Sequence, residues 1–293
     1  MQLVSRRIYT LPLRGKDCVL GERTLVMGIL NVTPDSFSDG GCFATADAAI
    51  AHGLGLFEAG ADLVDVGGES TRPGGVAVAP DEEIRRVAPV IAGLRARGAS
   101  YLSVDTTKAE VAAAALDAGA DLVNDVSGFR FDPNLARLVA AWGVPAVAMH
   151  LRGSYETMHE RPSYCDVMAE VAAELRESLA KAAAAGLSRE RIILDPGLGF
   201  AKKGSHSLES LARLGELRAL DRPLLVGPSR KSFLGKVLDL PAGERLFGTA
   251  AAVAASVLGG AHLVRVHDVR EMVQVVRVCD AILAAAPVMA GQP

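Results

Sequence analysis

The chain has 293 residues, of which 50% are apolar, 22% are charged and 4% are aromatic, and its net charge is −3. A chain of this length suits two domains of about 150 residues or one α/β barrel of about 250. The nearly neutral charge and the few aromatic side chains disfavour nucleic acid as a partner, because nucleic acid requires a basic surface or stacking platforms.

The sequence predicts a cytoplasmic protein without a membrane span. Residues Met1–Arg7 lack the apolar core and the small-residue cleavage site of a secretory signal. The four cysteines are scattered and form no Cys-x-x-Cys pair, which is typical of free thiols in a reducing compartment. The segment Leu246–Val264 has no Asp, Glu, Lys or Arg, but Gly259 and Gly260 divide it. We therefore expect a buried helix followed by a strand there.

From residue 25 onward, short apolar runs alternate with stretches of helical length. Runs that are apolar on both faces are typical of buried parallel strands. The predicted strands are 25–30, 63–66, 101–104, 122–123, 146–149, 192–194, 224–226 and 263–266. The predicted helices are 45–59, 81–98, 108–118, 133–142, 164–185, 206–220, 243–258 and 269–285. Several of these helices end at a glycine, which favours the left-handed turn that closes a helix.

The alternation favours a closed (β/α)8 barrel over an open sheet, because about eight βα units fit a chain of this size. No Gly-x-Gly-x-x-Gly motif follows the first strand, which argues against a dinucleotide-binding fold. We expect an α/β protein with a single barrel domain (a TIM barrel) over residues 25–285. Residues 1–24 are expected to form an extended cap at the bottom of the barrel, and residues 286–293 a short tail.

Hydrogen-bonding or charged side chains stand at the end of every predicted strand. Barrel enzymes place their reactive groups at these ends, where the loops converge. Arg265 and Asp65 lie inside otherwise apolar strands, where an unpaired charge would be costly. One polar residue at a strand end is usually a helix cap or a turn former, but the complete set predicts a rim that binds a ligand.

The residue types at this rim indicate two kinds of ligand group. Cationic side chains, together with neutral oxygens that suit a hydrated Mg2+, predict a site for a phosphorylated group. These residues are Arg72, Lys231, Arg265 and His267, with Asn31 and Thr71 as the neutral oxygens. Carboxylate acceptors and an amide predict a site for the polar edge of a flat heterocycle. This second set consists of Asp105, Asn124 and Asp195, with Phe200 close by to contact the ring.

Two loops rich in glycine and proline, 31–41 and 67–75, follow the first two strands. Loops of this kind are typical of mobile covers that exclude water during a reaction. The alternative is that they are surface turns without a role. Because both follow barrel strands, we expect them to stand over the same mouth.

Seven motifs along the chain resemble, in order, the signatures of the dihydropteroate synthase family. They are Met27–Gly41, Asp65–Gly74, Ser103–Thr106, Asn124–Gly128, Asp195–Gly197, Ser229–Phe233 and Arg265–His267. The first two are long and specific. The resemblance implies a pterin-binding barrel that uses Mg2+ and joins 4-aminobenzoate to 6-hydroxymethyl-7,8-dihydropterin diphosphate. The products would be 7,8-dihydropteroate and diphosphate, in folate synthesis.

The resemblance also implies a role for each matching residue. The pterin would be held by Asp105, Asn124, Asp195 and Lys231 and framed by Met149, Phe200, Gly227 and Arg265. The diphosphate would be held by Asn31, Thr71, Arg72, Arg265 and His267, with Asn31 as the ligand to the metal. The 4-aminobenzoate pocket, which sulfonamides occupy in this family, would be lined by Pro34, Phe37, Thr71, Pro73 and Ser232. Members are generally homodimers that pair through helices late in the chain.

The sequence departs from the family where Pro228 follows Gly227, because most members have a residue with a backbone N–H at that position. Ser207 also stands where Asn is frequent. Neither change removes a charged group. No pyrophosphokinase or aldolase segment accompanies the barrel, so the resemblance implies a free-standing, bacterial-type enzyme.

The chemistry of the rim favours an ionising, SN1-like route. Cations stabilise the departing diphosphate, and the electron-rich dihydropterin delocalises the positive charge that is left. The arylamine is already a nucleophile, so no activating Ser-His or Cys-His pair is required. We expect Asp35 to steady the cation or to position the amine. The catalytic candidates are Asp35, Arg72, Lys231, Arg265 and His267.

Two other functions are open at this point. A related barrel passes a methyl group from a methylated folate to a corrinoid protein, but that reaction needs no diphosphate anchors such as Arg72 and Lys231. A catalytically silent pterin-binding protein would be expected to lack Asn31, Arg72 or His267, and all three are present. Diphosphate release that depends on 4-aminobenzoate distinguishes the synthase from both alternatives.

Overall fold

Eight parallel strands form the centre of the fold, and each begins at, or one residue after, the start predicted from the sequence. The computed structural model describes residues 3–13, 15–33, 42–70, 78–154, 157–158 and 162–286. The strands are β3 (Leu25–Asn31), β4 (Leu63–Gly67), β5 (Tyr101–Asp105), β6 (Leu122–Asp125), β7 (Ala146–Met149), β8 (Ile192–Asp195), β9 (Leu225–Val226) and β10 (Leu263–Val266). Their order is β8-β7-β6-β5-β4-β3-β10-β9, and a parallel bridge between Leu194 and Leu224 joins the two ends into a barrel.

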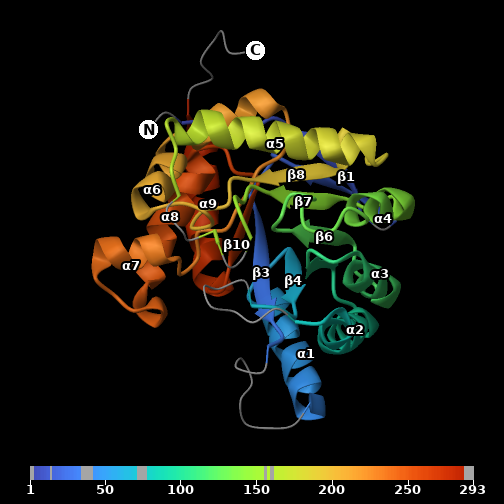
Figure 1. The fold of residues 1–293 in the computed structure, drawn as a ribbon. Coiled ribbons are helices and arrows are strands. Elements are labelled where there is room, and N and C mark those ends of the chain that lie inside the picture. The colour runs from blue at the N-terminus through green and yellow to red at the C-terminus, as the bar shows by residue number, and fades with distance from the viewer. Residues whose placement is uncertain are drawn as a thin grey trace.

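Helices surround these strands on the outside (Figure 1). They are α1 (Cys42–Glu58), α2 (Pro80–Ala96), α3 (Ala109–Ala118), α4 (Leu135–Trp142), α5 (Val167–Ala184), α6 (Gly204–Ala212), α7 (Ser232–Leu238), α8 (Leu246–Leu258) and α9 (Val269–Ala285). Gly119 and Gly143 close α3 and α4 in the left-handed conformation. Buried aliphatic side chains between helices and strands form the main core. The single-domain (β/α)8 barrel predicted from the sequence is confirmed.

Two helical predictions are wrong in detail. The helix predicted over 206–220 is divided into α6 and a 3-10 helix, η3 (Leu214–Leu220). Gly215 lies in η3 against the amino-terminal segment, where a Cβ would stand only 2.8 Å from Val4 Cγ2. Helix α7 begins at Ser232, where the sequence suits a helix start, but its extent is not predicted because seven residues are too few to show helical periodicity.

The uncharged segment Leu246–Val264 forms α8 and then β10, as predicted. Within the described parts of the chain, none of the helices combines the length and the apolar content that crossing a membrane requires.

An amino-terminal hairpin covers the end of the barrel where the strands begin. Strands β1 (Tyr9–Leu13) and β2 (Lys16–Leu20) pair antiparallel. Their buried residues form an apolar cluster with residues at or near the beginnings of the barrel strands. The members of this cluster include Leu11, Leu13, Cys18 and Leu20 of the hairpin and Leu25, Leu63, Leu122, Ile193, Leu225 and Leu263 of the barrel. This apolar plug leaves the opposite end of the barrel for polar side chains.

Leu20→Ala is expected to lower the free energy of unfolding by about 2–5 kcal/mol, because the Leu20 side chain is fully buried in the plug. Val19→Ala is the matched control on the same strand, since Val19 is 41% exposed. It is expected to change stability by no more than about 0.5 kcal/mol. Urea unfolding of the two variants checks the prediction, and equal losses would show that the plug contributes little.

Candidate active site

A network of hydrogen-bonded, charged side chains lies toward the carboxyl ends of β4, β5, β6 and β10. Arg265 Nε donates to Asp65 Oδ2 at 2.6 Å, and a terminal nitrogen of Arg265 donates to Asp105 Oδ2 at 2.8 Å. Asn124 Nδ2 also donates to Asp65 Oδ2, at 2.8 Å. The structure therefore brings together three of the predicted rim residues, Asp105, Asn124 and Arg265.

Asp65 is the centre of this network, although it is not among the site residues expected from the sequence. Its side chain is fully buried, and Oδ1 has no hydrogen-bond partner among the described residues. Ser103, which pairs with Asp65 in the sheet register, has a buried Oγ that likewise lacks a partner within the described chain. The sequence signal for Asp65 was a carboxylate in an apolar strand. Its pairing with Arg265 joins positions 200 residues apart.

The network holds a fixed cation between two carboxylates. Burial raises the pKa of Asp105 to about 7, although Arg265 opposes this shift. Burial alone would lower the pKa of Arg265, but Asp65 and Asp105 raise it above its usual value. The guanidinium therefore stays charged while one of its carboxylate partners titrates near neutral pH.

Asp195 and Lys231 form an oppositely charged pair of groups at the same mouth. Gly197 N donates to Asp195 Oδ1 at 2.7 Å, and Lys231 Nζ lies 3.9 Å from the centre of the Phe200 ring. Burial raises the pKa of Asp195 to about 6. Burial also lowers the pKa of Lys231 to about 8, and Asp195 opposes that shift. Between these two values both groups are charged.

Apolar side chains adjoin the Asp195 carboxylate. Met149 ends β7 and pairs in register with Asp195, and it shares a buried apolar cluster with Phe200. The predicted frame residues Met149 and Phe200 therefore lie beside the predicted polar group Asp195. A flat ring with one polar edge fits these surroundings.

The described residues expected to hold a diphosphate lie on β3, on β10 and directly after β10, and the predicted pterin-frame residue Gly227 adjoins them. Asn31 ends β3 and is half-buried. His267 follows β10, and its Nδ1 is 2.9 Å from Ser229 Oγ. Gly227 follows β9 and faces Arg265, because a Cβ on this glycine would stand 3.8 Å from Arg265 Cβ. These positions surround the open end of the barrel next to the charged network.

Ser232 begins α7 and lines a cavity of about 320 Å3 at the edge of this mouth. Gly199, Lys202, Lys203 and Lys236 also line it. The exposed lysines Lys203 and Lys236 give the cavity a positive charge, which suits an anionic group such as a carboxylate.

Six predicted site residues lie outside the described residues: Pro34, Asp35, Phe37, Thr71, Arg72 and Pro73. The described ends of the loop around 71–77 are held together at the rim. Glu69 Oε1 accepts a hydrogen bond from Val78 N at 2.7 Å, and Lys108 Nζ forms ion pairs with both Glu69 and the buried Glu83. Glu69 stands at the end of a predicted strand, but nothing in the sequence marks the pairing of Lys108 with Glu69 and Glu83.

Comparison with known proteins identifies the family. A family model described as pterin binding enzyme matches residues 27–267. A dihydropteroate synthase of Synechocystis sp. is 47% identical over 263 residues, which are 89% of this chain and 91% of the relative. The chain belongs to the dihydropteroate synthase family.

Solved structures of dihydropteroate synthases agree with this membership. The enzyme of Xanthomonas albilineans with 4-aminobenzoic acid is 45% identical, with a TM-score of 0.89 over 96% of this chain and 100% of that one. The Yersinia pestis dihydropteroate synthase, in a sulfonamide drug complex, is 42% identical, also with a TM-score of 0.89, over 94% and 100%. As a dihydropteroate synthase, the chain condenses (7,8-dihydropterin-6-yl)methyl diphosphate with 4-aminobenzoate, giving 7,8-dihydropteroate and diphosphate.

Proposed function

We propose that the synthase reaction takes place at the charged network, with the pterin between Asp105, Asn124 and Asp195. The observation that carries this proposal is the pairing of Arg265 with Asp65 and Asp105, beside the Asp195 carboxylate. The polar edge of a pterin carries N–H donors and a carbonyl. Carboxylates accept from those donors, while Asn124 and Lys231 supply donors for the acceptors. Met149, Phe200 and Gly227 frame the ring.

The chemical step is the exchange of one bond at the pterin CH2 group. The CH2–O bond to diphosphate breaks, the electron pair leaves with the diphosphate, and the dihydropterin ring delocalises the positive charge. Arg265 and His267 stabilise the leaving oxygens, with Thr71 and Arg72 assigned to the same task by the family motif. The amine of 4-aminobenzoate then forms the new C–N bond and loses its proton to diphosphate or water. Asp35 is proposed to steady the cation or to position this amine.

Mg2+ is proposed as the metal of this reaction, held through the diphosphate and Asn31. In the described part of the chain, no group of three or more His, Cys, Asp or Glu side chains is placed to hold a metal. A Mg2+ ion fits such a site, because it is usually held by one or two protein groups, waters and substrate phosphates. The metal would supply charge neutralisation on the diphosphate.

The 4-aminobenzoate pocket is proposed at the Ser232 end of the mouth, with Pro34, Phe37, Thr71 and Pro73 in the loops above it. The cationic cavity beside Ser232 supports this position for the carboxylate of the substrate. Sulfonamides, which resemble 4-aminobenzoate in shape and polarity, are proposed to bind there as inhibitors.

The assay for this proposal measures diphosphate released from the pterin substrate with and without 4-aminobenzoate. We expect repeated turnover only when 4-aminobenzoate and Mg2+ are both present, and a strong loss with excess EDTA that added Mg2+ restores. Because the CH2–O bond breaks before the amine attacks, one release of diphosphate per active site without 4-aminobenzoate agrees with this route. Repeated turnover without 4-aminobenzoate would contradict the condensation. Activity that is unchanged by EDTA would contradict the proposed requirement for Mg2+. Release that sulfonamide does not reduce would contradict the assigned pocket for the inhibitor.

Binding of the pterin substrate is expected to be strongest between about pH 7 and pH 8, because the pKa values of Asp195 and Asp105 are about 6 and about 7 and that of Lys231 is about 8. As the pH falls through about 6, Asp195 takes up a proton and loses an acceptor. Asp105 titrates at about 7 and adds to the same loss. As the pH rises through about 8, Lys231 loses its proton and its charge. Calorimetric titration across this range checks the prediction, and an affinity independent of pH would contradict it.

A homodimer is proposed through the apolar surface of α7, α8 and α9. Phe247 is 86% exposed at the start of α8, and Val237, Leu238 and Val278 are exposed on neighbouring helices. Leu238 lies against the α8 backbone, because a Cβ at Gly248 would stand 2.7 Å from Leu238 Cδ1. Large exposed apolar side chains that gather in this way mark protein interfaces.

Phe247→Glu is expected to weaken the dimer by about 30-fold or more, the effect typical of losing a central aromatic anchor. Trp142→Glu is the matched control, because Trp142 is an exposed aromatic residue on α4, on the other side of the barrel (Figure 1). Analytical ultracentrifugation of both variants measures the effect. A dimer that persists in the Phe247 variant would place the interface elsewhere.

The cytoplasm is the proposed location. Cys165 and Cys279 are free thiols among the described residues. Thiols of this kind persist in a reducing compartment.

A further inference from the structure

The buried side chain of Lys202 holds the loop that follows β8. Lys202 is only 7% exposed, and its Nζ donates to the carbonyl oxygens of Gly197 at 3.2 Å and Phe200 at 3.3 Å. The same Nζ lies 2.8 Å from His150 Nδ1. Burial lowers the pKa of Lys202 to about 7, although Asp195 and Glu174 oppose this shift, and the protonated side chain has three N–H donors. Each of the three therefore has a partner inside the protein, and two of the partners belong to the loop.

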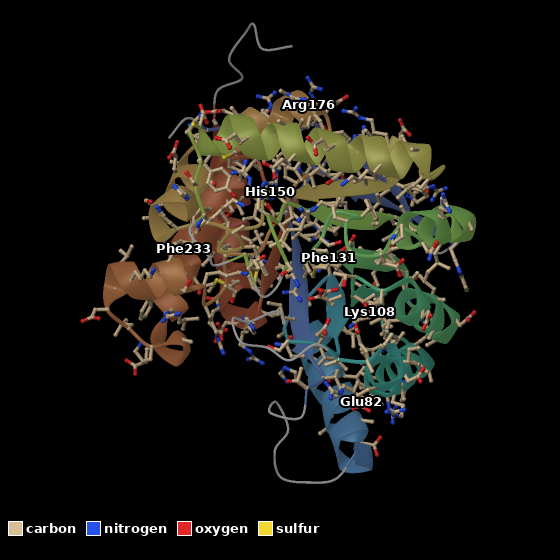
Figure 2. The ribbon with its side chains drawn as sticks, viewed as in Figure 1. Glu82, Lys108, Phe131, His150, Arg176 and Phe233 are labelled. Carbon is tan, nitrogen blue, oxygen red and sulfur yellow. The ribbon has the colours of Figure 1, made fainter. Side chains whose placement is uncertain are left out.

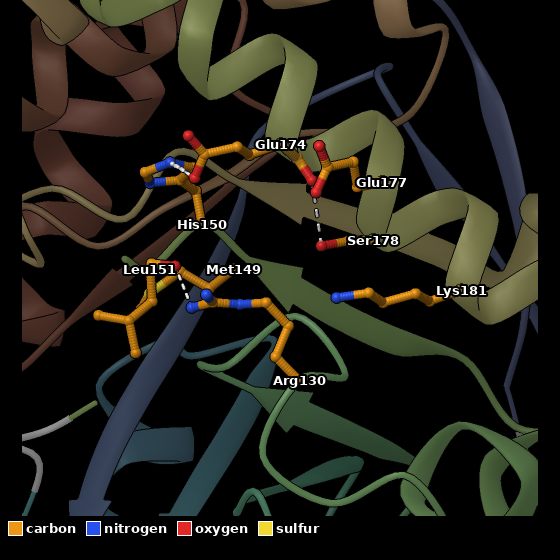
Figure 3. A pocket seen from close by; sticks show the side chains of 8 residues that line it. All are labelled: Arg130, Met149, His150, Leu151, Glu174, Glu177, Ser178 and Lys181. Atoms are coloured by element: carbon orange, nitrogen blue, oxygen red, sulfur yellow. Dashed lines mark hydrogen bonds and ion pairs between the residues drawn. The ribbon is translucent and has the colours of Figure 1, made fainter. Parts of the chain in front are cut away.

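His150 connects this side chain to α5. Its ring is buried between β7 and α5 (Figure 2), and Nε2 lies 3.1 Å from Glu174 Oε2 (Figure 3). Burial, with the charge of Lys202, lowers the pKa of His150 to about 4, so the ring is neutral at physiological pH. Because Nδ1 accepts from Lys202, the single ring proton is on Nε2 and is donated to Glu174.

Glu174 is itself fixed in place. Arg152 Nε donates to Glu174 Oε1 at 2.7 Å, and the Arg152 guanidinium stacks 4.0 Å above the Tyr164 ring. Burial alone would raise the pKa of Glu174, but the hydrogen bonds from His150 and Arg152 lower it to about 2. Tyr164 OH donates to the Ala201 carbonyl at 2.9 Å. A third carbonyl of the same loop is thus bound from the α5 side.

The loop needs this support, because three of its residues have positive φ. Gly197 (66°), Gly199 (78°) and Ala201 (48°) adopt the left-handed region, which is unfavourable for alanine. A Cβ on Gly197 would collide with the carbonyl oxygen of His150. The loop also carries groups of the pterin site, since Gly197 N binds Asp195 and the Phe200 ring contacts Lys231.

We propose that Glu174, His150 and Lys202, named here the Lys202 anchor, position the 197–202 loop so that Asp195 and Phe200 present the right surface to the pterin. The Lys202 side chain lines the cavity beside Ser232, but its Nζ is bound within the protein. None of the three residues is assigned a bond to substrate, so they are positioning residues. The inference rests on the proposed pterin site. It adds a structural origin for the precision of that site.

Two substitutions of His150 test the anchor atom by atom. Asparagine places its side-chain oxygen near the former Nδ1 and can still accept from Lys202. Glutamine places its amide nitrogen near the former Nε2 and can still donate to Glu174, but offers Lys202 no acceptor. We expect His150→Gln and Lys202→Met to raise the KM for the pterin substrate at least about tenfold, the effect of about 1.4 kcal/mol. We expect His150→Asn to raise it less than about threefold, with small changes in the KM for 4-aminobenzoate throughout.

Thermal melting of every variant separates positioning from general stability. Lys181→Met is the matched control, because Lys181 is an exposed lysine on the helix that carries Glu174 (Figure 3). It is expected to leave both KM values unchanged. Provided that the wild-type enzyme is active, two results would contradict the proposed role of the Lys202 anchor. One is an equal KM for the pterin substrate in the His150→Asn and His150→Gln variants. The other is a set of KM changes that only follow the melting temperatures of the variants. A wild-type protein that releases no diphosphate would instead overturn the proposed function, and the anchor with it. If Lys202→Met does not fold, the His150 pair decides the result.

Discussion

Asp195→Asn is expected to weaken binding of the pterin substrate by about 100-fold or more. Gly197 N donates to Asp195 Oδ1 at 2.7 Å, which fixes the orientation of any amide placed there. The asparagine oxygen would face this N–H, and its NH2 group would face the N–H donors of the pterin. Two donors would then oppose each other in a buried site. The loss of a charged acceptor and the unpaired donors together cost about 3 kcal/mol or more, which is about 100-fold in affinity.

Calorimetric titration with the pterin substrate measures this loss. Asp221→Asn is the matched control, because Asp221 is an exposed aspartate in the left-handed conformation, which asparagine also adopts readily. The control is expected to bind like the wild type. Near-normal affinity in Asp195→Asn would show that the carboxylate does not accept from the pterin edge.

Arg265→Met is expected to remove detectable activity and to lower the free energy of unfolding by about 3–5 kcal/mol. The substitution leaves Asp65 buried without its cation, while Asp105 loses the other half of the pair. A carboxylate that is buried without a partner destabilises the folded state more than removal of both members of the pair. The double variant Asp65→Leu/Arg265→Met is therefore expected to be more stable than Arg265→Met alone, and still inactive.

Urea unfolding of the wild type, of Asp65→Leu, of Arg265→Met and of the double variant forms a double-mutant cycle. Sites that interact directly give a coupling of about 0.5–3 kcal/mol, whereas independent sites give additive losses. Additive losses would contradict the pairing of Asp65 with Arg265. Recovery of activity in the double variant would contradict the catalytic role of Arg265.

The fold was predictable from the sequence because its signals are local. Each buried strand is a short apolar run, and glycines such as Gly119 and Gly143 mark the helix ends. Local signals were not enough for α7, which is too short to show periodicity, or for the break between α6 and η3. Gly215 of η3 lies against Val4, and nothing in the sequence marks this approach of two distant residues.

The candidate site was predictable in its residue types but not in its pairings. Strand ends identified Asp105, Asn124 and Asp195, and the structure brings these residues to one mouth. The hydrogen bonds to Asp65 were not predictable, since they join strands that are distant in the chain. The end of the strand 146–149 marked His150 as a polar residue of the rim, but nothing in the sequence marked its bond to Lys202. A buried lysine looks like any other lysine until its neighbours are known.

The apolar plug and the charged network lie at opposite ends of the barrel. This separation affects which substitutions the folded protein tolerates. Residues that hold the fold together at the hairpin end lie at the opposite end from the proposed substrate site. With the inhibitor pocket proposed at the open end, we expect substitutions there to alter inhibitor recognition with little effect on the core. A population exposed to an antifolate drug can sample such loop variants without first losing folded protein.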